Sequence, residues 1–201
     1  MFTPKMIFTS LALILLISCS NEKKEEVSKS SEQKIEKKTT QQNFDEYYAA
    51  ALTGDIEKIK VSVSKGLDII NLPNKEGQTF LMLASFNGHT ELCEYLIKNG
   101  AHVEARDNSG RTALIYASTG PFATTVKLLL NNGANSNAVD HEEKWTALMN
   151  AAAEGQLEVV KLLMQYGADK NLKDIEGDTA ESFALQKNHL EVVNFLKNYT
   201  Q

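Results

Sequence analysis

The chain contains the stretch Gly77-Gln78-Thr79-Phe80-Leu81-Met82-Leu83-Ala84, and three related stretches follow it. They are Gly110-Arg111-Thr112-Ala113-Leu114-Ile115-Tyr116-Ala117, Thr146-Ala147-Leu148-Met149-Asn150-Ala151 and Gly177-Asp178-Thr179-Ala180-Glu181-Ser182-Phe183-Ala184. The threonines of successive stretches lie 33, 34 and 33 residues apart. Such a period is typical of repeat proteins, in which each unit buries its apolar face only against its neighbours. We therefore expect a stack of similar units.

A Gly-Ala pair follows each of the first three threonines by 21 residues, and Gly66 marks an earlier unit. The pairs are Gly100-Ala101, Gly133-Ala134 and Gly167-Ala168. Apolar residues with helical spacing lie between the markers, for example Leu92, Cys93 and Leu96. We predict two helices in each unit. The threonine should cap the first helix, and the glycine should end the second in the left-handed conformation.

These motifs resemble the ankyrin repeat, whose pattern is Gly-x-Thr-Pro-Leu-His-x-Ala-Ala, then Gly-His-x-Glu-Val-Val, then Leu-Leu-Leu-x-x-Gly-Ala. The resemblance covers about 155 residues. It implies an all-α repeat fold, an ankyrin solenoid of about five helix-turn-helix units joined by β-hairpin loops. We place the repeat domain at 44–201 and its units at 44–74, 75–107, 108–140, 141–174 and 175–201.

Three departures from the family pattern indicate where this stack is unusual. The proline of the pattern is absent, and its histidine position holds Met82, Ile115 and Met149, so the buried threonine–histidine hydrogen bonding of the family is expected to be missing. In unit three, Pro121 fixes φ and removes an N–H group, which predicts an altered turn between its helices. Unit four has one extra residue in its loop, which ends at the only tryptophan, Trp145.

The N-terminal segment has the pattern of a targeting signal. Lys5 precedes an apolar run over 6–17, which is too short for the roughly 20 residues that span a bilayer and is typical of a secretory signal peptide. Its end, Leu16-Ile17-Ser18-Cys19, resembles the lipobox of bacterial lipoproteins. The resemblance implies a signal peptide over 1–18 and lipid modification of Cys19. The alternative is an ordinary signal peptide in which Cys19 is incidental.

Residues 19–43 are mainly Lys, Glu, Ser, Gln and Thr. Such a segment cannot bury enough apolar surface to offset its ordering entropy, so we predict a disordered tether between the lipid and the repeats. The residue after Cys19 is Ser20 rather than aspartate, and by the sorting rule of enteric bacteria this favours the outer membrane. The expected location is the outer membrane, with the domain facing the periplasm or the cell surface.

Charge and motif content exclude several functions. Residues 43–201 carry 14 basic and 21 acidic side chains, which argues against nucleic acid as a partner, because binding to the phosphate backbone requires clustered Lys and Arg. Cys19 and Cys93 cannot form a disulfide framework, and neither has zinc-ligand spacing. Common nucleophile, phosphate-loop and metalloprotease motifs are absent from the sequence. We expect no catalytic residues, no metal site and no cofactor.

The resemblance implies a monomeric, non-catalytic protein–protein interaction module that binds an unidentified protein through its concave face, formed by loop tips and the exposed ends of the first helices. The residues that register places there are Phe86, Asn87, Asn108, Arg111, Thr119, His141, Glu142, Trp145, Glu154, Asp178 and Lys187. Phe86, Arg111 and Trp145 belong to adjacent units, and aromatic and arginine side chains most often dominate interface energy. Alternatively, Trp145 packs along the next hairpin.

A second hypothesis is an escort for a small ligand or cofactor, such as haem or a metal, serving a periplasmic enzyme. Its ligands would come from His141, His102 or the methionines Met82, Met149 and Met164. Packing explains Met82 and Met149 more simply, because they occupy equivalent positions in their helices. A third hypothesis is a purely structural spacer without a partner.

Overall fold

The computed structural model describes residues 44–66 and 69–200. The N-terminal predictions, namely the signal peptide, the lipid-modified Cys19 and the tether over 19–43, lie outside the described residues. A helix over 44–53 begins the described part. It is followed by α2 (Ile56–Ser64), α3 (Phe80–Phe86), α4 (Thr90–Lys98), α5 (Ala113–Ala117), α6 (Ala123–Asn131), α7 (Ala147–Ala153), α8 (Leu157–Gln165), α9 (Ala180–Gln186) and α10 (Leu190–Asn198).

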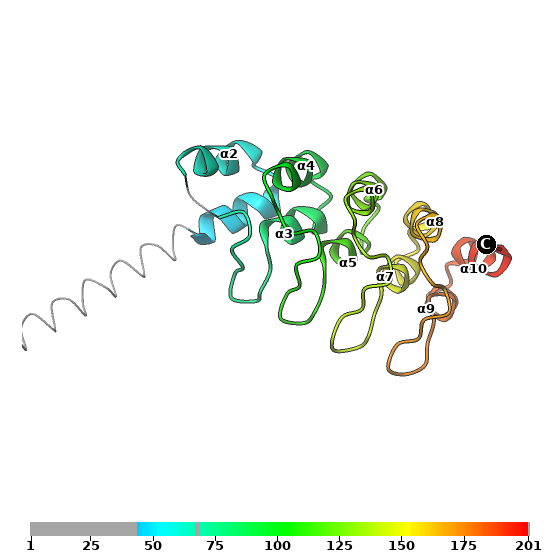
Figure 1. Cartoon of the computed structure of the whole chain (residues 1–201). Helices are drawn as coiled ribbons and strands as arrows, with labels where there is room; N and C mark the ends of the chain where they lie inside the picture. Colours follow the sequence, from blue (N-terminus) through cyan, green and yellow to red (C-terminus); the bar gives the residue numbers. More distant parts are fainter. Residues whose placement is uncertain (1–43, 67–68, 201) are drawn as a thin grey trace, which may run out of the picture. The chain divides into compact units, whose positions relative to one another are not determined.

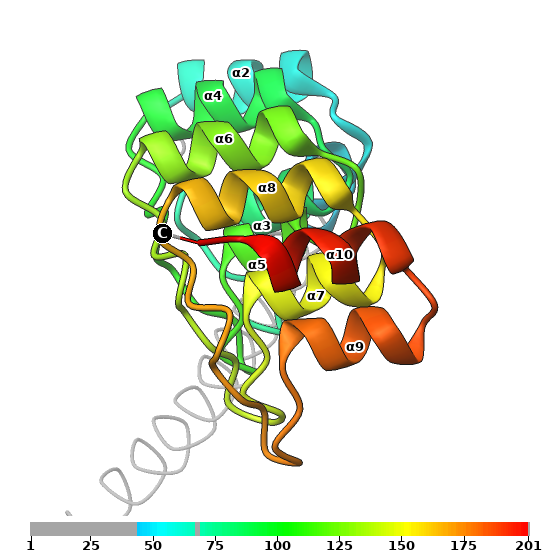
Figure 2. The same ribbon diagram turned by 90° about the vertical axis from the view of Figure 1, so that its right-hand side faces the viewer.

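The helices form two parallel rows, as Figure 1 shows. One row contains the second helix of each unit, α2, α4, α6, α8 and α10, and the other contains the first helices, including α3, α5, α7 and α9. Figure 2, seen toward the C-terminal unit, shows both rows overlapping from unit to unit, with the long loops projecting beyond the first helices. The predicted all-α repeat fold is therefore confirmed. Within the described residues, no helix is both long and apolar enough to cross a bilayer.

The predicted threonine caps are confirmed in four units. Thr79, Thr112, Thr146 and Thr179 each have extended backbone angles and accept a hydrogen bond from the backbone N–H three residues later. These bonds satisfy N–H groups that a helix start otherwise leaves without a partner, so each first helix begins at a defined residue. The predicted left-handed glycines after the second helices are also confirmed, with φ between 79° and 89° in the three Gly-Ala pairs.

Small residues allow the first helices of neighbouring units to approach closely. The alanine five residues after each threonine is fully buried, and these residues are Ala84, Ala117, Ala151 and Ala184. Leucine two residues after the threonine is buried in the three inner units. In the last unit this position holds Glu181, which is half-buried and lies 3.8 Å from Lys197 Nζ. The core therefore continues from unit to unit, and this one position becomes polar in the C-terminal unit.

The loops differ from the expected β-hairpins. Each is closed by the side chain of its first residue, which accepts two backbone N–H groups from the turn; these residues are Asn74, Asp107, Asp140 and Asp174. Each loop keeps one main-chain bond across it, from the N–H of this first residue to the carbonyl of the residue before the threonine, and the side-chain oxygen takes the returning N–H that would extend a ladder. The described residues contain turns here and one isolated bridge, between Val139 and Thr146. The extra residue of unit four is accommodated by Lys144, which has a φ of 58°.

The loops are also bonded to one another through their main chains. The N–H of Asn108 donates to the carbonyl of Glu76, at 3.0 Å. The N–H of His141 donates to Ser109 O at 2.8 Å, and the N–H of Ile175 to Glu143 O at 3.1 Å. The loop tips therefore form a continuous strip, and these main-chain bonds do not depend on the identity of the tip side chains.

The departures from the family pattern have local substitutes. Histidine is absent from the first helices, but Met82 Sδ accepts the N–H of Thr79 at 3.4 Å, and Met149 Sδ accepts that of Thr146 at 3.5 Å. The expected loss of the threonine–histidine bond is thus partly offset by sulfur, a weak acceptor.

The altered turn of unit three is also confirmed, because α5 has only five residues and Phe122 precedes α6. The ring of Phe122 lies against Gly88 of the preceding unit. In units two and five, His89 and His189 take the same position against Gly54 and Gly155. Their Nε2 atoms lie 2.9 Å and 3.1 Å from backbone carbonyl oxygens. Both histidines therefore have structural partners in the turn of the preceding unit.

Candidate protein-interaction surface

The loops and the first helices together form a surface that we call the loop face. It is defined by the residue before each capping threonine (Gln78, Arg111, Trp145, Asp178), the residue four after it (Leu83, Tyr116, Asn150, Phe183) and the residue seven after it (Phe86, Thr119, Ala153, Gln186). The predicted binding residues belong to this face or to the adjoining loop tips and helix ends. The main-chain bonds between loops and the threonine caps hold the backbone of the loop face in place.

An aromatic and cationic cluster crosses from unit two to unit three on this face. The rings of Phe86, at the end of α3, and Tyr116, from α5, pack in a T-shaped arrangement with centroids 6.0 Å apart. The guanidinium carbon of Arg111 lies 4.9 Å from the centroid of Tyr116. Phe86 is 44% exposed, the Arg111 side chain is 41% exposed, and Tyr116 is buried between them. The structure therefore brings together two of the three predicted anchor residues, Phe86 and Arg111.

A buried hydrogen-bond network holds this cluster in position. Asp107 uses Oδ1 to close its loop, and Oδ2 accepts from Arg111 Nε at 3.0 Å and from the Tyr116 hydroxyl at 2.6 Å. Gln78 Nε2 in turn donates to the Tyr116 oxygen at 2.8 Å. Four side chains from two neighbouring units are thus linked through one carboxylate and one phenol.

The pKa directions agree with this geometry. Burial alone would raise the pKa of Asp107, but the hydrogen bonds from Tyr116 and Arg111, together with the positive charge of Arg111, hold that pKa below its usual value. Burial and the hydrogen bond to Asp107 raise the pKa of Tyr116. Asp107 is therefore ionised and Tyr116 neutral at neutral pH, which is the pairing that the network requires.

Trp145 lies elsewhere on the loop face. Its ring packs on Phe183 of α9, with centroids 4.4 Å apart, and the side chain is half-buried. This position favours the packing interpretation of Trp145, although the contact is with the first helix of the next unit rather than with its hairpin. Gln78 and Tyr116 occupy the same two positions in units two and three, and they also touch. The residue before one capping threonine therefore contacts the residue four after the next capping threonine in both pairs of units.

Most of the other predicted binding residues already have partners within the fold. Asn87, Asn108 and Thr119 donate to the carbonyls of Leu52, Lys75 and Tyr116, respectively. Glu142 accepts from the Ser109 hydroxyl, Asp178 accepts from Gln186 Nε2, and the His141 ring packs on Gly110. Glu154 and Lys187 are exposed. All of these residues except Glu154 and Lys187 therefore help to hold the loops and turns, whether or not they also contact a partner protein.

Sequence reasoning did not assign Tyr116 or Asp107 to the site. Tyr116 stands at a position held by Leu83, Asn150 and Phe183 in other units, so a comparison of this one position across the units could have singled it out. In the sequence, Asp107 stands out only as a polar residue at the start of a loop. Its Oδ2 atom joins the network only because Arg111 and Tyr116, which both belong to unit three, donate hydrogen bonds to it.

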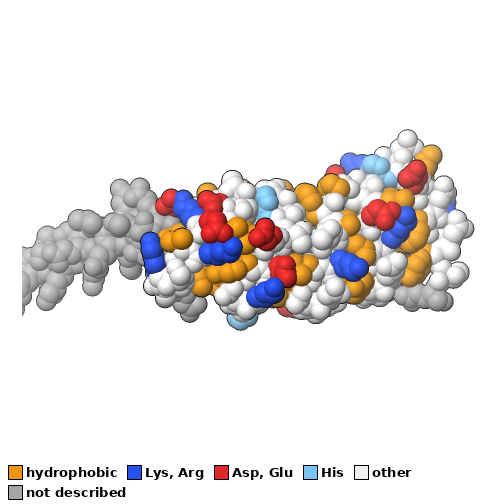
Figure 3. All heavy atoms as spheres, turned by 90° about the horizontal axis from the view of Figure 1, so that it is seen from above, with side chains coloured by type: hydrophobic (Ala, Val, Ile, Leu, Met, Phe, Trp, Pro, Cys, Tyr) orange, Lys and Arg blue, Asp and Glu red, His pale blue; other side chains and the backbone are white. Residues whose placement is uncertain are grey.

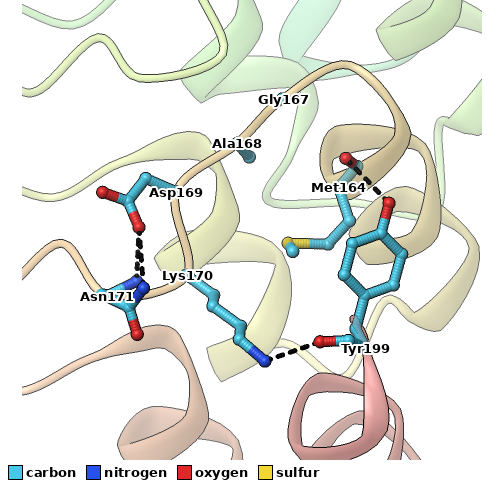
Figure 4. A pocket seen from close by; sticks show the side chains of 7 residues that line it. All are labelled: Met164, Gly167, Ala168, Asp169, Lys170, Asn171 and Tyr199. Carbon is cyan, nitrogen blue, oxygen red and sulfur yellow. Dashed lines mark hydrogen bonds between the residues drawn. The ribbon is translucent and has the colours of Figure 1, made fainter. Parts of the chain in front are cut away.

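A small cavity of about 180 Å³ lies near the C-terminal unit (Figure 4). It is lined by Met164, Gly167, Ala168, Asp169, Lys170, Asn171 and Tyr199. Lys170 Nζ donates to the carbonyls of Leu196 and Tyr199 at 2.8 and 2.9 Å, and the Tyr199 hydroxyl donates to Met164 O at 3.2 Å. Ligand pockets usually have about 300–1,000 Å³. The cavity is smaller, and its polar groups satisfy helix-end carbonyls.

Of the residues that a haem or metal escort would use, the methionines are buried, the His141 ring packs on Gly110, and His102 is exposed in its loop. These methionines are Met82, Met149 and Met164. Burial raises the pKa of the Cys93 thiol to about 11, so it is not a reactive thiolate at neutral pH. Over 44–66 and 69–200, no group of three or more His, Cys, Asp or Glu side chains could hold a metal ion.

The face formed by the second helices has a different character. Figure 3 shows it from above, with acidic and basic side chains interspersed among smaller apolar areas. Several of these charges pair along one helix, as in Lys98 with Glu94 and Lys161 with Glu158. Exposed pairs of this kind contribute little to stability, and their mixed signs give no single charged patch for a partner.

Comparison with known proteins gives the same family along nearly the whole described region. The family model described as "Ankyrin repeats (3 copies)" matches residues 47–140 and 120–201. The chain is 34% identical over 136 residues to ankyrin repeat and SAM domain-containing protein 6 of Mus musculus, covering 68% of this chain and 12% of that protein. It is 30% identical over 146 residues to the probable 26S proteasome regulatory subunit p28 of Saccharomyces cerevisiae, covering 70% and 63%.

A third relative is the tyrosine-protein kinase HTK16 of Hydra vulgaris, 32% identical over 135 residues. This match covers 65% of the present chain but only 17% of the kinase. The chain thus spans between 12% and 63% of the length of these three relatives. The ankyrin-repeat family is generally non-catalytic. The capped helix pairs, the stacked loops and the family match together show that this chain belongs to the ankyrin-repeat family, whose repeats are protein–protein interaction modules.

Proposed function

We propose that this chain is a membrane-tethered, non-catalytic module that binds a partner protein through its loop face. The observation that carries the proposal is the Phe86–Tyr116–Arg111 cluster. It presents an exposed aromatic ring and a half-exposed guanidinium on a backbone that caps and loop-to-loop bonds hold in place. Aromatic and arginine side chains are enriched among residues that dominate interfaces, and a site ordered before binding loses less conformational entropy.

The tether is the N-terminal part of the same proposal. The apolar run over 6–17 and the lipobox-like Leu16-Ile17-Ser18-Cys19 support lipid modification of Cys19. The polar segment over 19–43 supports a flexible link that separates the ankyrin domain from the lipid headgroups. We place the module at a bacterial outer membrane, facing the periplasm or the cell surface.

Lipid modification predicts a change in mass and in fractionation. The native mature protein should begin at Cys19 and exceed its polypeptide mass by the attached lipid, and it should sediment with membranes. Cys19→Ala should accumulate as an unprocessed precursor or a soluble form, because the nucleophile that receives the lipid is gone. Intact mass spectrometry of both fractions checks this, with Ser20→Ala as the control that keeps Cys19. A mature protein that starts at another residue without added mass would contradict the tether.

The loop face predicts where a partner can be cross-linked. A photo-reactive phenylalanine analogue at Phe86 should form an adduct with a defined protein in the cells that make this chain. The same analogue at Lys127, which is exposed on α6 among the second helices, should not. In a chain that carries the photo-reactive residue at a position near Phe86, the further substitution Phe86→Ala or Arg111→Ala should weaken binding of the captured protein by more than about 1 kcal/mol. The melting temperature of the chain should stay unchanged. Adducts confined to Lys127 would show that the partner binds the other row of helices.

A further inference from the structure

Arg111 is held by one nitrogen and leaves the others available. Its Nε donates to Asp107 Oδ2, and among the described residues neither Nη donates a hydrogen bond to a neighbour. A guanidinium binds a carboxylate most strongly through two parallel N–H groups, and the two Nη atoms retain such a pair. Arg106, in the same loop, differs, because its Nη1 donates to the carbonyls of Gly110 and Val139 and so holds the loop together.

The position of Arg111 is determined before any partner arrives. The Tyr116 ring lies 4.9 Å from the guanidinium, and the Tyr116 hydroxyl shares Asp107 Oδ2 with Arg111 Nε. Gln78 fixes that hydroxyl from the preceding unit. An arginine that is already ordered loses little rotamer freedom on binding, so more of the interaction energy becomes affinity. Unit three is the only unit that has a cation directly before its capping threonine.

The surroundings of Arg111 indicate what it would bind. The exposed ring of Phe86 lies next to Tyr116 on the neighbouring unit, so an apolar contact is available beside the guanidinium. The loop over 106–111 contains two arginines and one aspartate, whereas the loops over 140–145 and 173–178 together contain six acidic residues and two lysines. An acidic segment is therefore attracted to unit three and repelled from units four and five.

We propose that Arg111 and Phe86 form a docking site for a protein segment in which an Asp or Glu side chain is adjacent to an aromatic or large aliphatic residue. The carboxylate binds the two Nη groups of Arg111, and the apolar side chain packs on Phe86. The site rests on the proposed function and specifies the chemistry of the partner segment. Asp107, Tyr116 and Gln78 act as positioning residues for Arg111.

Selection from a displayed library of short random peptides tests this site. The full chain serves as bait, and the full chain with Arg111→Gln serves for counter-selection. Enriched peptides should share an Asp or Glu next to an apolar residue. A synthetic peptide from this set should lose about tenfold or more in affinity with Arg111→Gln, as expected for a charge-assisted bidentate pair. Replacing its acidic residue by the amide should cause a similar loss, and the two changes together should add little further.

Matched variants separate this site from general electrostatics. Lys75→Gln removes one charge from the preceding loop and should change affinity by less than about twofold, because an exposed flexible lysine contributes little. Arg111→Lys keeps the charge but lacks the fork, so its affinity should fall between the wild type and Arg111→Gln. The peptide-side substitution remains informative even where an Arg111 variant is less stable.

Two outcomes would overturn the inference. One is enrichment of peptides without an acidic residue, or of acidic peptides whose affinity is unchanged by Arg111→Gln. If such peptides still lose affinity with Phe86→Ala, the loop face remains the binding surface and only its chemistry was assigned wrongly. The other is the absence of any enriched peptide. Cross-linking at Phe86 in cells then decides separately whether the proposed function fails too.

Discussion

Leu148→Ala is expected to lower the free energy of unfolding by about 2–5 kcal/mol, the range found for large-to-small changes at buried leucines. Leu148 lies in α7 with 1% of its surface exposed. Because the core of a repeat stack continues through each unit, the cavity weakens packing within unit four and against its neighbours. Urea unfolding followed by circular dichroism, with the slope of the transition compared between variants, measures the loss.

The matched control is Glu181→Leu at the equivalent position of the last unit. Glu181 is half-buried, and its ion pair with Lys197 is partly exposed, so its removal costs little. A leucine there adds apolar contact, and the expected change is neutral or stabilising. Equal destabilisation by the two variants would show that these positions are not equivalent and that the repeat register is wrong.

Gly88→Ala is expected to destabilise the chain by about 2–5 kcal/mol, through two separate effects. Gly88 has a φ of 68°, and a side chain in the left-handed conformation costs about 1–2 kcal/mol. In addition, the new Cβ would overlap Cδ1 of Phe122, so the ring that unit three places on unit two must shift. Overpacking of this kind typically costs about 1–3 kcal/mol more.

Gly100→Ala separates the two effects. Gly100 also has positive φ, 89°, but a Cβ there would meet no atom within 4 Å. Its substitution should cost only the backbone contribution, about 1–2 kcal/mol. The two variants are compared by thermal and urea unfolding. Equal losses would show that Phe122 does not hold the turn between units two and three.

Features whose partners are close in sequence could be predicted. The caps at Thr79, Thr112, Thr146 and Thr179 involve an N–H three residues away, and local spacing reveals them. The repeat period predicted the fold for a related reason. Each unit contains the same local pattern of apolar residues, and this pattern packs the unit against the next one.

Features that join separate units could be predicted only in part. The bond from Gln78 to Tyr116 spans 38 residues and needs a particular pair of side chains in neighbouring units. Register placed Phe86 and Arg111 on one face, but it could not show that Tyr116 and Asp107 connect them. It also left two positions open for Trp145, because an aromatic ring before the threonine can contact either a partner or the next unit.

The way in which the loops close was also not predicted from the sequence. The side chains of Asn74, Asp107, Asp140 and Asp174 take the turn N–H groups, so each loop keeps one main-chain bond across it instead of an extended ladder. The alternation that predicts a strand cannot be recognised in so few residues, whereas an Asx residue at the start of a turn can bond to its own backbone in the same way in every unit.

The main-chain bonding between loop tips has a consequence for how such a protein can change. Side chains such as Lys75, Glu143 and Glu176 project from a strip that is held together by peptide groups, by the first residue of each loop and by a few inter-loop side chains such as Asn108. Exchanging these tip residues leaves the supporting bonds intact, so charge and shape along the strip can vary at small thermodynamic cost. Sequence drift at the tips would then alter which proteins are recognised while the architecture persists, and new specificity could arise one loop at a time.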